Sequence, residues 1–337
     1  WQSAFTDESL EPGDRVAVMI NNCREWVIFE QAALAMGLVV VPLYVNDRAE
    51  NVAYIIDDAD IKVLLLPDSE QWQALQEVRS TLDKLVRVLT LQEISENVSS
   101  NLRCIDSWLP PEPKTVALSS CIPGDLATIV YTSGTTGRPK GVMLSHHNIL
   151  WNAFSAMKYI PCFSEDVFLS FLPLSHTLER TTGYYLPMMG GAEVAYARSI
   201  PYLAEDLLSI RPTVLISVPR IYERIVIKVR DTLAEKGGIA PKLFEAAVKV
   251  GWQNFQYQQG QGSWSPSLIV WPVLQKLVAK KILDRLGGRI RAAMCGGAPL
   301  SLPVAQVFLG LGLPLIQGYG LTETSPVVSV NTFKSDY

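Results

Sequence analysis

The stretch RVAVMINNCREWVIFEQAALAMGLVVVP, residues 15–42, contains the pattern that decides the fold. Its first six residues, 15–20, are mostly apolar or branched and predict a buried strand. Residues 24–36 place their large apolar side chains near one face of a helix, which Gly37 ends. Residues 38–42 predict the next strand. Because a strand, a helix and a second strand in this order are typical of a parallel sheet with crossover helices, the predicted fold class is α/β.

The same alternation continues on both sides of a proline-rich stretch, 93–124, in which periodicity fades. Further strands are predicted at 62–66, 86–90, 126–131, 167–171, 192–197, 213–217, 289–294 and 313–317. Helices are predicted at 49–58, 69–79, 147–158 and, with breaks at 237–238 and 260–266, over most of 219–286. We therefore expect stacked βα subdomains: a first α/β subdomain at 1–120, and a second at 121–337 that contains the functional motifs and a helical insert.

Composition excludes several classes of protein. The 337 residues include 29 Lys and Arg against 33 Asp and Glu, a formal net charge of −4, which argues against a nucleic-acid-binding protein. The longest apolar stretch, 32–45, is interrupted by Gly37 and Pro42 and is shorter than the roughly 20 residues of a spanning helix. Five scattered cysteines form no Cys-x-x-Cys pair, so neither a disulfide framework nor a zinc site is expected, and a cytoplasmic location is favoured.

Residues 131–141, YTSGTTGRPKG, form the strongest functional motif. They lie between a predicted strand and a predicted helix. Glycines let backbone N–H groups approach phosphate oxygens, hydroxyl groups add donors, and Lys140 adds positive charge. The motif is not a Walker A loop, because Pro139 precedes Lys140 and Gly141 follows it. We expect a cradle for a polyphosphate; the alternative is a connection rich in Gly, Ser and Thr that binds nothing.

Three blocks together resemble the AMP-forming adenylating enzymes, the superfamily of AMP-dependent synthetases and ligases. This superfamily includes acyl-CoA synthetases, firefly luciferases and nonribosomal adenylation domains. The blocks are 131–141, MCGGAPL at 294–300 and QGYGLTETSP at 317–326, and their order and spacing match the family over nearly the whole chain. The resemblance implies the large N-terminal α/β domain of these enzymes, binding of ATP and AMP, Mg²⁺, and coenzyme A as a co-substrate.

The resemblance also implies which residues contact the nucleotide. The first block would hold the β- and γ-phosphates through Thr132, Ser133, Gly134, Thr135, Thr136, Gly137 and Lys140. The second block would line the adenine through Gly296, Gly297, Ala298 and Pro299. Taken alone, this second block is equally well explained as a plain turn from a strand to a helix.

The third block would complete the nucleotide site. Its implied residues are Gln317, Gly318, Tyr319, Gly320 and Thr322, with Tyr319 stacked on the base, Gly318 and Gly320 admitting the backbone to the α-phosphate, and Thr322 offering a hydroxyl. Glu323 is an acidic residue beside an anionic ligand, which favours a cation between them, so Glu323 is the expected Mg²⁺ ligand together with Ser133. The alternative for Glu323 is a carboxylate favoured by a helix N-terminus.

Two further stretches point to the acid that is activated. LPLSHTLERTTGYY at 172–185 and VPRIYER at 218–224 resemble the long-chain fatty acyl-CoA synthetase branch, and no early acidic residue that would bind an amino group is identified. The resemblance implies that His176 lies beside the acyl carboxylate, whereas a lone histidine after a strand is more often structural. The implied catalytic residues are His176, Lys140, Thr322 and Glu323.

The helical insert at 241–286 is rich in aromatic residues, which could form ordinary core, wall an acyl tunnel or touch a membrane. They are Phe244, Trp252, Phe255, Tyr257, Trp264 and Trp271. A basic run follows, which suits an anionic lipid face or any solvated helix. It consists of Lys276, Lys280, Lys281, Arg285, Arg289 and Arg291. A peripheral membrane contact is therefore an open alternative, and the oligomeric state is not predicted.

The resemblance implies an AMP-forming long-chain fatty acid–CoA ligase. In this reaction a carboxylate attacks the α-phosphate of ATP to give acyl-AMP and pyrophosphate, and the thiol of coenzyme A then displaces AMP. Family members continue with an Asp that binds the ribose, a hinge and a small domain carrying a lysine, whereas this chain ends fourteen residues after Glu323. We therefore expect a fragment without its C-terminal domain and with little turnover. The alternatives are a nucleotide- or acyl-binding module, or an enzyme for aryl or amino acids.

Overall fold

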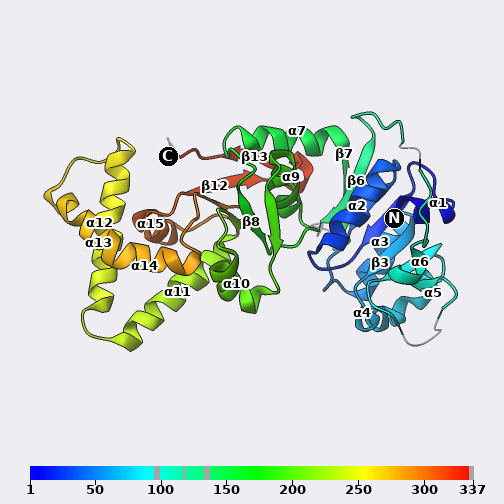
Figure 1. Cartoon of the computed structure of the whole chain (residues 1–337), viewed down its shortest axis with the longest axis horizontal. Helices are drawn as coiled ribbons and strands as arrows, with labels where there is room; N and C mark the ends of the chain where they lie inside the picture. Colours follow the sequence, from blue (N-terminus) through cyan, green and yellow to red (C-terminus); the bar gives the residue numbers. More distant parts are fainter. Residues whose placement is uncertain (95–98, 117–118, 133–136, 334–337) are drawn as a thin grey trace. The chain divides into compact units, whose positions relative to one another are not determined.

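The structure, a computed structural model, describes residues 1–94, 99–116, 119–132 and 137–333. The chain divides into two compact units (Figure 1). The first consists of Trp1–Trp151 with Pro173–Arg180, and the second of Asn152–Leu172 with Thr181–Tyr337. Each unit is built around its own sheet.

The first unit contains a seven-stranded sheet with the order β5-β4-β3-β1-β2-β6-β7. Its strands are β1 (Arg15–Val18), β2 (Val39–Pro42), β3 (Ile61–Leu66), β4 (Arg87–Thr90), β5 (Leu102–Cys104), β6 (Leu126–Thr132) and β7 (Lys140–Ser145). Neighbouring strands are parallel except for β6 and β7, which are antiparallel. Most residues of the central strands are buried on both faces, which explains why these strands are mostly apolar in the sequence. The predicted α/β class is confirmed.

Short helices surround this sheet. They are α1 (Gln2–Asp7), α2 (Arg24–Ala35), α3 (Ala49–Asp58), α4 (Ser69–Ala74), the 3₁₀-helix η1 (Gln76–Val78), α5 (Arg79–Leu82), α6 (Ile105–Trp108) and α8 (Thr177–Glu179). Helix α7 (His146–Met157) begins in this unit and continues into the second, which starts at Asn152. Helix α2 packs Trp26 and Phe29 into the core, and Gly37 follows its end with φ +76°. A Cβ atom at Gly37 would lie 2.8 Å from the Ser119 hydroxyl, so glycine is required there.

The predicted boundary near residue 120 and the observed division of the chain differ. Strand β6 begins after the proline-rich stretch, yet Thr128 pairs with Val40 of β2, and its hydroxyl donates to the Val40 carbonyl at 2.5 Å. Because β6 extends the first sheet, the first unit continues to Trp151. The prolines therefore lie within this unit, in a stretch that also contains β5 and α6, neither of which the sequence predicted.

The second unit contains a six-stranded sheet with the order β13-β12-β11-β10-β8-β9. Its strands are β8 (Val167–Ser170), β9 (Glu193–Tyr196), β10 (Val214–Ser217), β11 (Ala292–Cys295), β12 (Leu315–Gly320) and β13 (Val327–Val330). All pairs are parallel except β12 and β13. The predicted strand at 289–294 is shifted, because Arg289 and Arg291 precede β11 and bind loop atoms and Asp166 instead.

The helices of the second unit include one long helical segment after β10. The helices that come before this segment in the sequence are the π-helix η2 (Arg180–Tyr185), α9 (Leu186–Gly190), η3 (Ile200–Tyr202) and α10 (Leu203–Ile210). Those that come after it are α15 (Leu302–Gly310) and the 3₁₀ turn η7 (Thr322–Thr324). The segment itself contains α11 (Pro219–Lys236), α12 (Ala240–Gln258), η4 (Pro266–Val270), α13 (Trp271–Leu274), η5 (Gln275–Ala279), α14 (Lys280–Leu283) and η6 (Asp284–Leu286). Both predicted breaks are confirmed.

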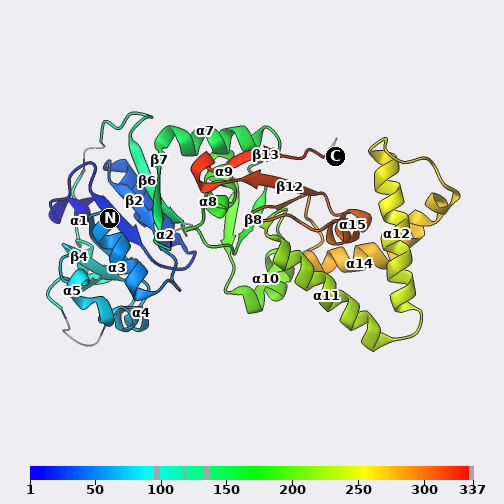
Figure 2. The ribbon, with the colours of Figure 1, turned by 180° about the vertical axis from the view of Figure 1, so that it is seen from behind.

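The helical segment is joined to the second sheet through a close contact between α12 and α15 (Figure 2). A Cβ atom at Gly251 would lie only 1.7 Å from the Gly310 carbonyl, and the Trp271 ring covers the same point. Phe244 and Trp271 are buried core residues, whereas Tyr257 and Trp264 are exposed. Most of the aromatic residues of the segment thus form ordinary core. Nowhere in the described ranges is a helix both long and apolar enough to cross a bilayer.

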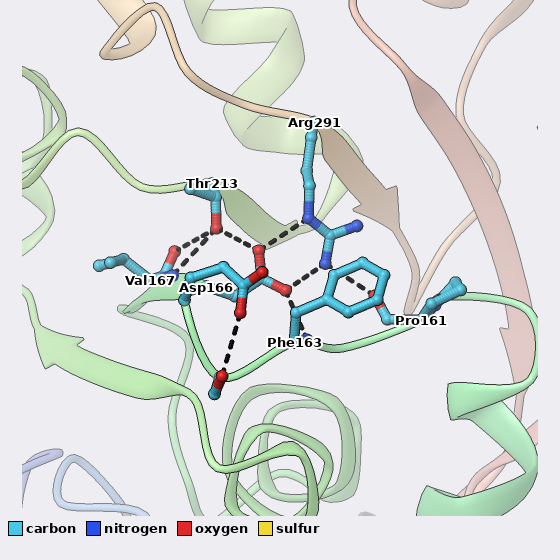
Figure 3. A network of polar contacts seen from close by, with 8 residues as sticks. Pro161, Phe163, Asp166, Val167, Thr213 and Arg291 are labelled. Carbon is cyan, nitrogen blue, oxygen red and sulfur yellow. Dashed lines mark hydrogen bonds and ion pairs between the residues drawn. The ribbon is translucent and has the colours of Figure 1, made fainter.

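A polar cluster joins the starts of three strands in the second sheet (Figure 3). The Asp166 carboxylate accepts hydrogen bonds from Arg291 Nε at 2.7 Å, from the Thr213 hydroxyl at 2.7 Å and from the Phe163 N–H at 2.8 Å. Burial alone would raise the pKa of Asp166, but these hydrogen bonds hold it below its ordinary value. Because these residues precede β8, β10 and β11, the cluster fixes the strands at the end opposite to the expected nucleotide motifs.

Candidate functional site

The expected phosphate motif is a hairpin in the structure. Strands β6 and β7 pair antiparallel up to Thr132 and Lys140, which lie opposite each other at the mouth of the loop. The sequence predicted a helix directly after the loop, whereas β7 intervenes before α7. Lys140 is exposed, and Gly137 has φ +90°, a conformation that favours glycine. Ser133, Gly134, Thr135 and Thr136 lie outside the described residues.

The base of this hairpin is firmly anchored. The Tyr131 hydroxyl donates to the Asp58 carboxylate, at the end of α3, at 2.5 Å. Burial and the nearby carboxylate both raise the pKa of Tyr131. A Cβ atom at Gly141, the cross-strand partner of Tyr131, would lie 2.7 Å from Ile129 and 3.1 Å from the Tyr131 ring. The last glycine of the motif is therefore needed for packing within the hairpin.

The second block follows β11. Gly296 is buried, and its N–H donates to the Ser217 carbonyl at 3.0 Å, whereas Gly297, Ala298 and Pro299 are exposed. Gly297 has φ +78°, which allows the chain to turn away from the sheet before α15 begins. The block therefore presents open backbone at the carboxyl end of a parallel strand, where α/β sheets commonly bind ligands.

The third block lies beside the second. Gln317 pairs with Cys295 in the parallel register of β11 and β12, and its side-chain carbonyl accepts a hydrogen bond from the Leu300 N–H at 3.3 Å. Tyr319 is 61% exposed, so its ring is available to a flat ligand. The two expected nucleotide blocks of the second unit thus meet at one edge of the sheet.

The two glycines that flank Tyr319 have a packing role. A Cβ atom at Gly318 would lie 2.3 Å from the end of the Met294 side chain, and one at Gly320 would lie 2.1 Å from the Pro326 carbonyl. Both glycines let β12 approach its neighbours, which is a reason for glycine that the sequence did not reveal. Their expected approach to the α-phosphate stays a prediction.

Asn152 is a positioning residue that sequence reasoning missed. Its side-chain amide lies against the turn between β12 and β13, where Nδ2 donates to the Val327 carbonyl at 2.9 Å and Oδ1 accepts from the Val327 N–H at 3.0 Å. This pair of bonds holds the turn that carries Thr322 and Glu323. Nothing in the sequence around Asn152, a polar residue within helix α7, pointed to a partner 175 residues away.

The carboxylate of Glu323, in this turn, is a type of ligand that suits a magnesium ion. Glu323 is exposed and directly follows Thr322 in the chain, so consecutive residues carry a hydroxyl and a carboxylate group. Mg²⁺ usually takes one or two carboxylates and completes its shell with water and substrate phosphates. Among the residues that the structure describes, no cluster of three His, Cys, Asp or Glu side chains could form an all-protein cage. Glu323 therefore fits a shared ion; the other expected ligand, Ser133, lies outside the described ranges.

His176 lies in a tight turn that belongs to the first unit. It caps α8, where Nδ1 accepts a hydrogen bond from the Leu178 N–H at 3.1 Å. Because Nδ1 is an acceptor, the neutral ring carries its proton on Nε2, which is a donor suited to a carboxylate. Desolvation by the surrounding protein lowers the pKa of His176, although the residue lies at the surface of its unit.

A buried ion pair lies directly behind this turn. Arg180 is 3% exposed and Glu30 of α2 is 0% exposed, and Arg180 Nε donates to Glu30 at 2.8 Å. A second guanidinium nitrogen donates to the Thr128 hydroxyl of β6 at 2.7 Å. The sequence did not predict this network, because its members are separated by up to 150 residues.

The predicted site residues are thus divided between the two units. Lys140 and His176 belong to the first unit, and the blocks that contain Gly296 and Tyr319 belong to the second. A family model described as AMP-binding enzyme matches residues 3–337 of this chain. The chain belongs to the AMP-binding enzyme family.

Relatives within the AMP-binding enzymes cover nearly all of the chain. The long-chain-fatty-acid–CoA ligase FadD15 of Mycobacterium bovis is 32% identical over 329 residues, which cover 96% of this chain and 54% of the relative. Long chain acyl-CoA synthetase 1 of Arabidopsis thaliana is 32% identical over 341 residues, 96% of this chain and 50% of the relative. The chain spans about half the length of the curated relatives it matches.

Solved structures of AMP-binding enzymes share the fold. An anthranilate CoA ligase in complex with anthranoyl-AMP aligns with a TM-score of 0.73 and 17% identity, covering 98% of this chain and 54% of that one. ATP-bound MatB from Rhodopseudomonas palustris aligns with a TM-score of 0.70 and 23% identity, covering 99% and 55%. These likenesses confirm the expected α/β architecture of the family's N-terminal part.

Proposed function

We propose that this chain is the nucleotide- and acid-binding part of an AMP-forming long-chain fatty acid–CoA ligase. The observation that carries the proposal is the 32% identity to long-chain acyl-CoA ligases across 96% of the chain. The geometry supports it, because the two nucleotide blocks of the second unit meet at the carboxyl edge of one sheet. ATP, a fatty acid and coenzyme A would be the small-molecule substrates.

In this proposal the residues act mainly by positioning and by charge. Lys140 and the hydroxyls of residues 132–136 would hold the β- and γ-phosphates, and Tyr319 would stack on the adenine beside the exposed Gly297 and Pro299. Glu323, with Ser133, would hold a Mg²⁺ ion, which neutralises phosphate charge when bound. The fatty acid carboxylate would then attack the α-phosphate, forming acyl-AMP and releasing pyrophosphate. The thiol of coenzyme A would displace AMP.

The proposal is tested by pyrophosphate exchange into ATP, with the protein expressed from its complete coding sequence. We expect exchange that depends on a long-chain fatty acid and is weak with aryl and amino acids. A response to amino acids alone, or to aryl acids alone, would overturn the fatty acyl assignment and favour the other adenylating reactions. Binding of ATP without exchange for any acid would favour a binding module.

The protonation state of His176 gives a second expected result. Because burial lowers its pKa, the ring should remain neutral at pH 7, and Nε2–H should donate to the acid. The longer glutamine side chain can bring its amide N–H close to the position of Nε2, whereas the shorter asparagine can replace Nδ1 as the helix cap but does not reach as far as Nε2. We expect His176→Asn to raise the KM for the acid about 10-fold and His176→Gln to raise it less. Protonation of His176 at lower pH keeps the Nε2–H donor and adds a positive charge, so a pH series of KM should show no loss of acid affinity as the ring becomes charged.

The cellular location and a membrane contact belong to the same proposal. All five cysteines are free thiols, which supports the expected cytoplasmic location. Ile269, Val273 and Leu277 are more than half exposed along one helical stretch, and Lys280 and Lys281 follow them. This arrangement supports a peripheral contact with an anionic bilayer.

A further inference from the structure

We infer that Arg180 is a positioning residue, which holds the His176 turn against the strand that leads into the phosphate hairpin. His176, which would orient the acid, and the hairpin that would hold the phosphates would then keep a fixed position relative to each other. The activity readout of this inference rests on the proposed function. Its geometry does not, because every residue involved belongs to the first unit.

Arg180 joins three separate parts of the first unit. Its guanidinium binds Glu30 of helix α2 through Nε at 2.8 Å and through a second, shorter contact. A further nitrogen donates to the Thr128 hydroxyl at 2.7 Å, and that hydroxyl donates onward to the Val40 carbonyl of β2 at 2.5 Å. The ring of Trp26 lies 5.6 Å from the guanidinium carbon. The side chain is thus bound on several sides and has no freedom to shift.

The backbone of Arg180 is tied to His176 in turn. The Arg180 N–H donates to the His176 carbonyl at 3.1 Å, across the single turn of α8. At the other end of the turn, the Leu174 N–H donates to Asn22 at 2.9 Å. The His176 turn is therefore attached to the rest of the first unit at both ends. At the Arg180 end the attachment is an ion pair.

On its other side, Arg180 is connected to the hairpin through strand β6. Thr128 and Thr132 lie on the same strand, β6, four residues or about 13 Å apart. Thr132 is the last paired residue before the loop, opposite Lys140. Strand β6 pairs with β2 at Thr128 and with β7 as far as Thr132, so the strand and its hairpin form the fixed side against which Arg180 holds the His176 turn.

The energetics of burial favour a positioning role over a stabilising one. A buried ion pair loses its hydration, and well-packed apolar side chains of similar volume often give equal stability. What apolar side chains cannot supply is the directional, forked geometry by which one guanidinium binds a carboxylate and a hydroxyl at once. The main effect of the pair Glu30 and Arg180 is therefore to fix the position of the turn, and its contribution to the free energy of unfolding is small.

The decisive experiment replaces both charges at once, in the protein expressed from its complete coding sequence. Glu30→Met combined with Arg180→Met should remain folded, with a thermal midpoint within a few degrees of the wild type. We expect the KM for the fatty acid to rise at least 10-fold, whereas the KM for ATP changes less than 3-fold, since Tyr131 and Asp58 still anchor the hairpin. A folded double variant with an unchanged KM for the acid overturns the inference.

The control is a guanidinium–carboxylate pair of the second unit, in which Asp166 is buried and Arg291 is half-buried. Asp166→Leu combined with Arg291→Met removes an ion pair that, within the described parts of the chain, has no hydrogen bond to the His176 turn and belongs to the second unit. It should leave the ratio of the two KM values unchanged. If the double Met variant does not fold, Thr128→Val keeps both charges but removes the hydroxyl that accepts from Arg180 and donates to the Val40 carbonyl, and it should raise the KM for the acid a few-fold. No change in Thr128→Val would also overturn the inference.

A readout that needs no activity separates this inference from the proposed function. The imidazole signal of His176, identified by its absence from the spectrum of His176→Asn, can be titrated by NMR. We expect its pKa to move up towards 6.5 in the double Met variant as the turn loosens. An unmoved titration contradicts the positioning role. Absence of fatty-acid-dependent exchange in the wild type, by contrast, contradicts only the proposed function.

Discussion

Replacing Gly251 with alanine is expected to lower the free energy of unfolding by about 3 kcal/mol. The new methyl group would lie 1.7 Å from the Gly310 carbonyl and 2.6 Å from the Trp271 ring. A backbone oxygen cannot rotate away as the end of a side chain can, so α12 and α15 must separate. Their separation would expose part of the core of the second unit, which includes Phe308 and Phe244. Urea unfolding of the wild type and the variant measures the effect.

Two further substitutions show whether close helix packing is the cause. Gly310→Ala brings its methyl group within 2.6 Å of the Val248 carbonyl at the same crossing, so it should destabilise in the same direction but less. At Gly124 a methyl group would meet nothing within 4 Å, so Gly124→Ala should change the unfolding free energy by no more than about 0.5 kcal/mol. Equal effects at Gly251 and Gly124 would refute the packing explanation.

Glu323→Gln is expected to reduce the turnover of pyrophosphate exchange about 100-fold in the protein expressed from its complete coding sequence. Glutamine keeps the size of the side chain but removes the negative charge, so the proposed Mg²⁺ ligand is lost. Because Glu323 is exposed, the thermal stability of the variant should equal that of the wild type. The variant should also need a higher Mg²⁺ concentration for half-maximal rate, which a titration of the metal would reveal.

An exposed glutamate elsewhere serves as the control for charge alone. Glu235 lies near the end of α11 and is also exposed, so Glu235→Gln changes the net charge by the same amount. Its exchange rate and Mg²⁺ dependence should equal those of the wild type. A Glu323→Gln variant that matched this control in both measurements would show that the carboxylate does not hold the ion.

The parallel strands were predicted well because they are buried on both faces. Residues 39–42 and 63–66, for example, form continuous apolar runs, which are typical of buried strands in an α/β protein. Strand β7 was missed because it is an edge strand: only one of the six residues Lys140–Ser145 is buried, and their apolar side chains follow one another without alternation. The predicted boundary at residue 120 differed from the structure because composition alone does not show which sheet a strand joins.

The candidate site residues were predicted from local motifs, and their contacts with a nucleotide stay predictions. The glycines and hydroxyls of residues 131–141 and the position of Tyr319 beside the 294–300 block follow from motifs that lie at strand ends. Asn152 and Arg180 were not predictable, because their roles depend on contacts with residues far away in the chain. The packing of Gly318 and Gly320 against Met294 and Pro326 likewise required the structure.

The short piece Pro173–Arg180 has a practical consequence for dividing this protein. The chain passes between the two units three times, because residues 173–180 belong to the first unit while the residues on both sides belong to the second. No single cut of the polypeptide therefore yields two intact halves. A piece that ended at Trp151 would contain Glu30 without its guanidinium partner and would leave a bare carboxylate in an apolar interior. Split-protein reporters or domain exchanges need to carry this eight-residue piece with the first unit, by circular permutation or by grafting.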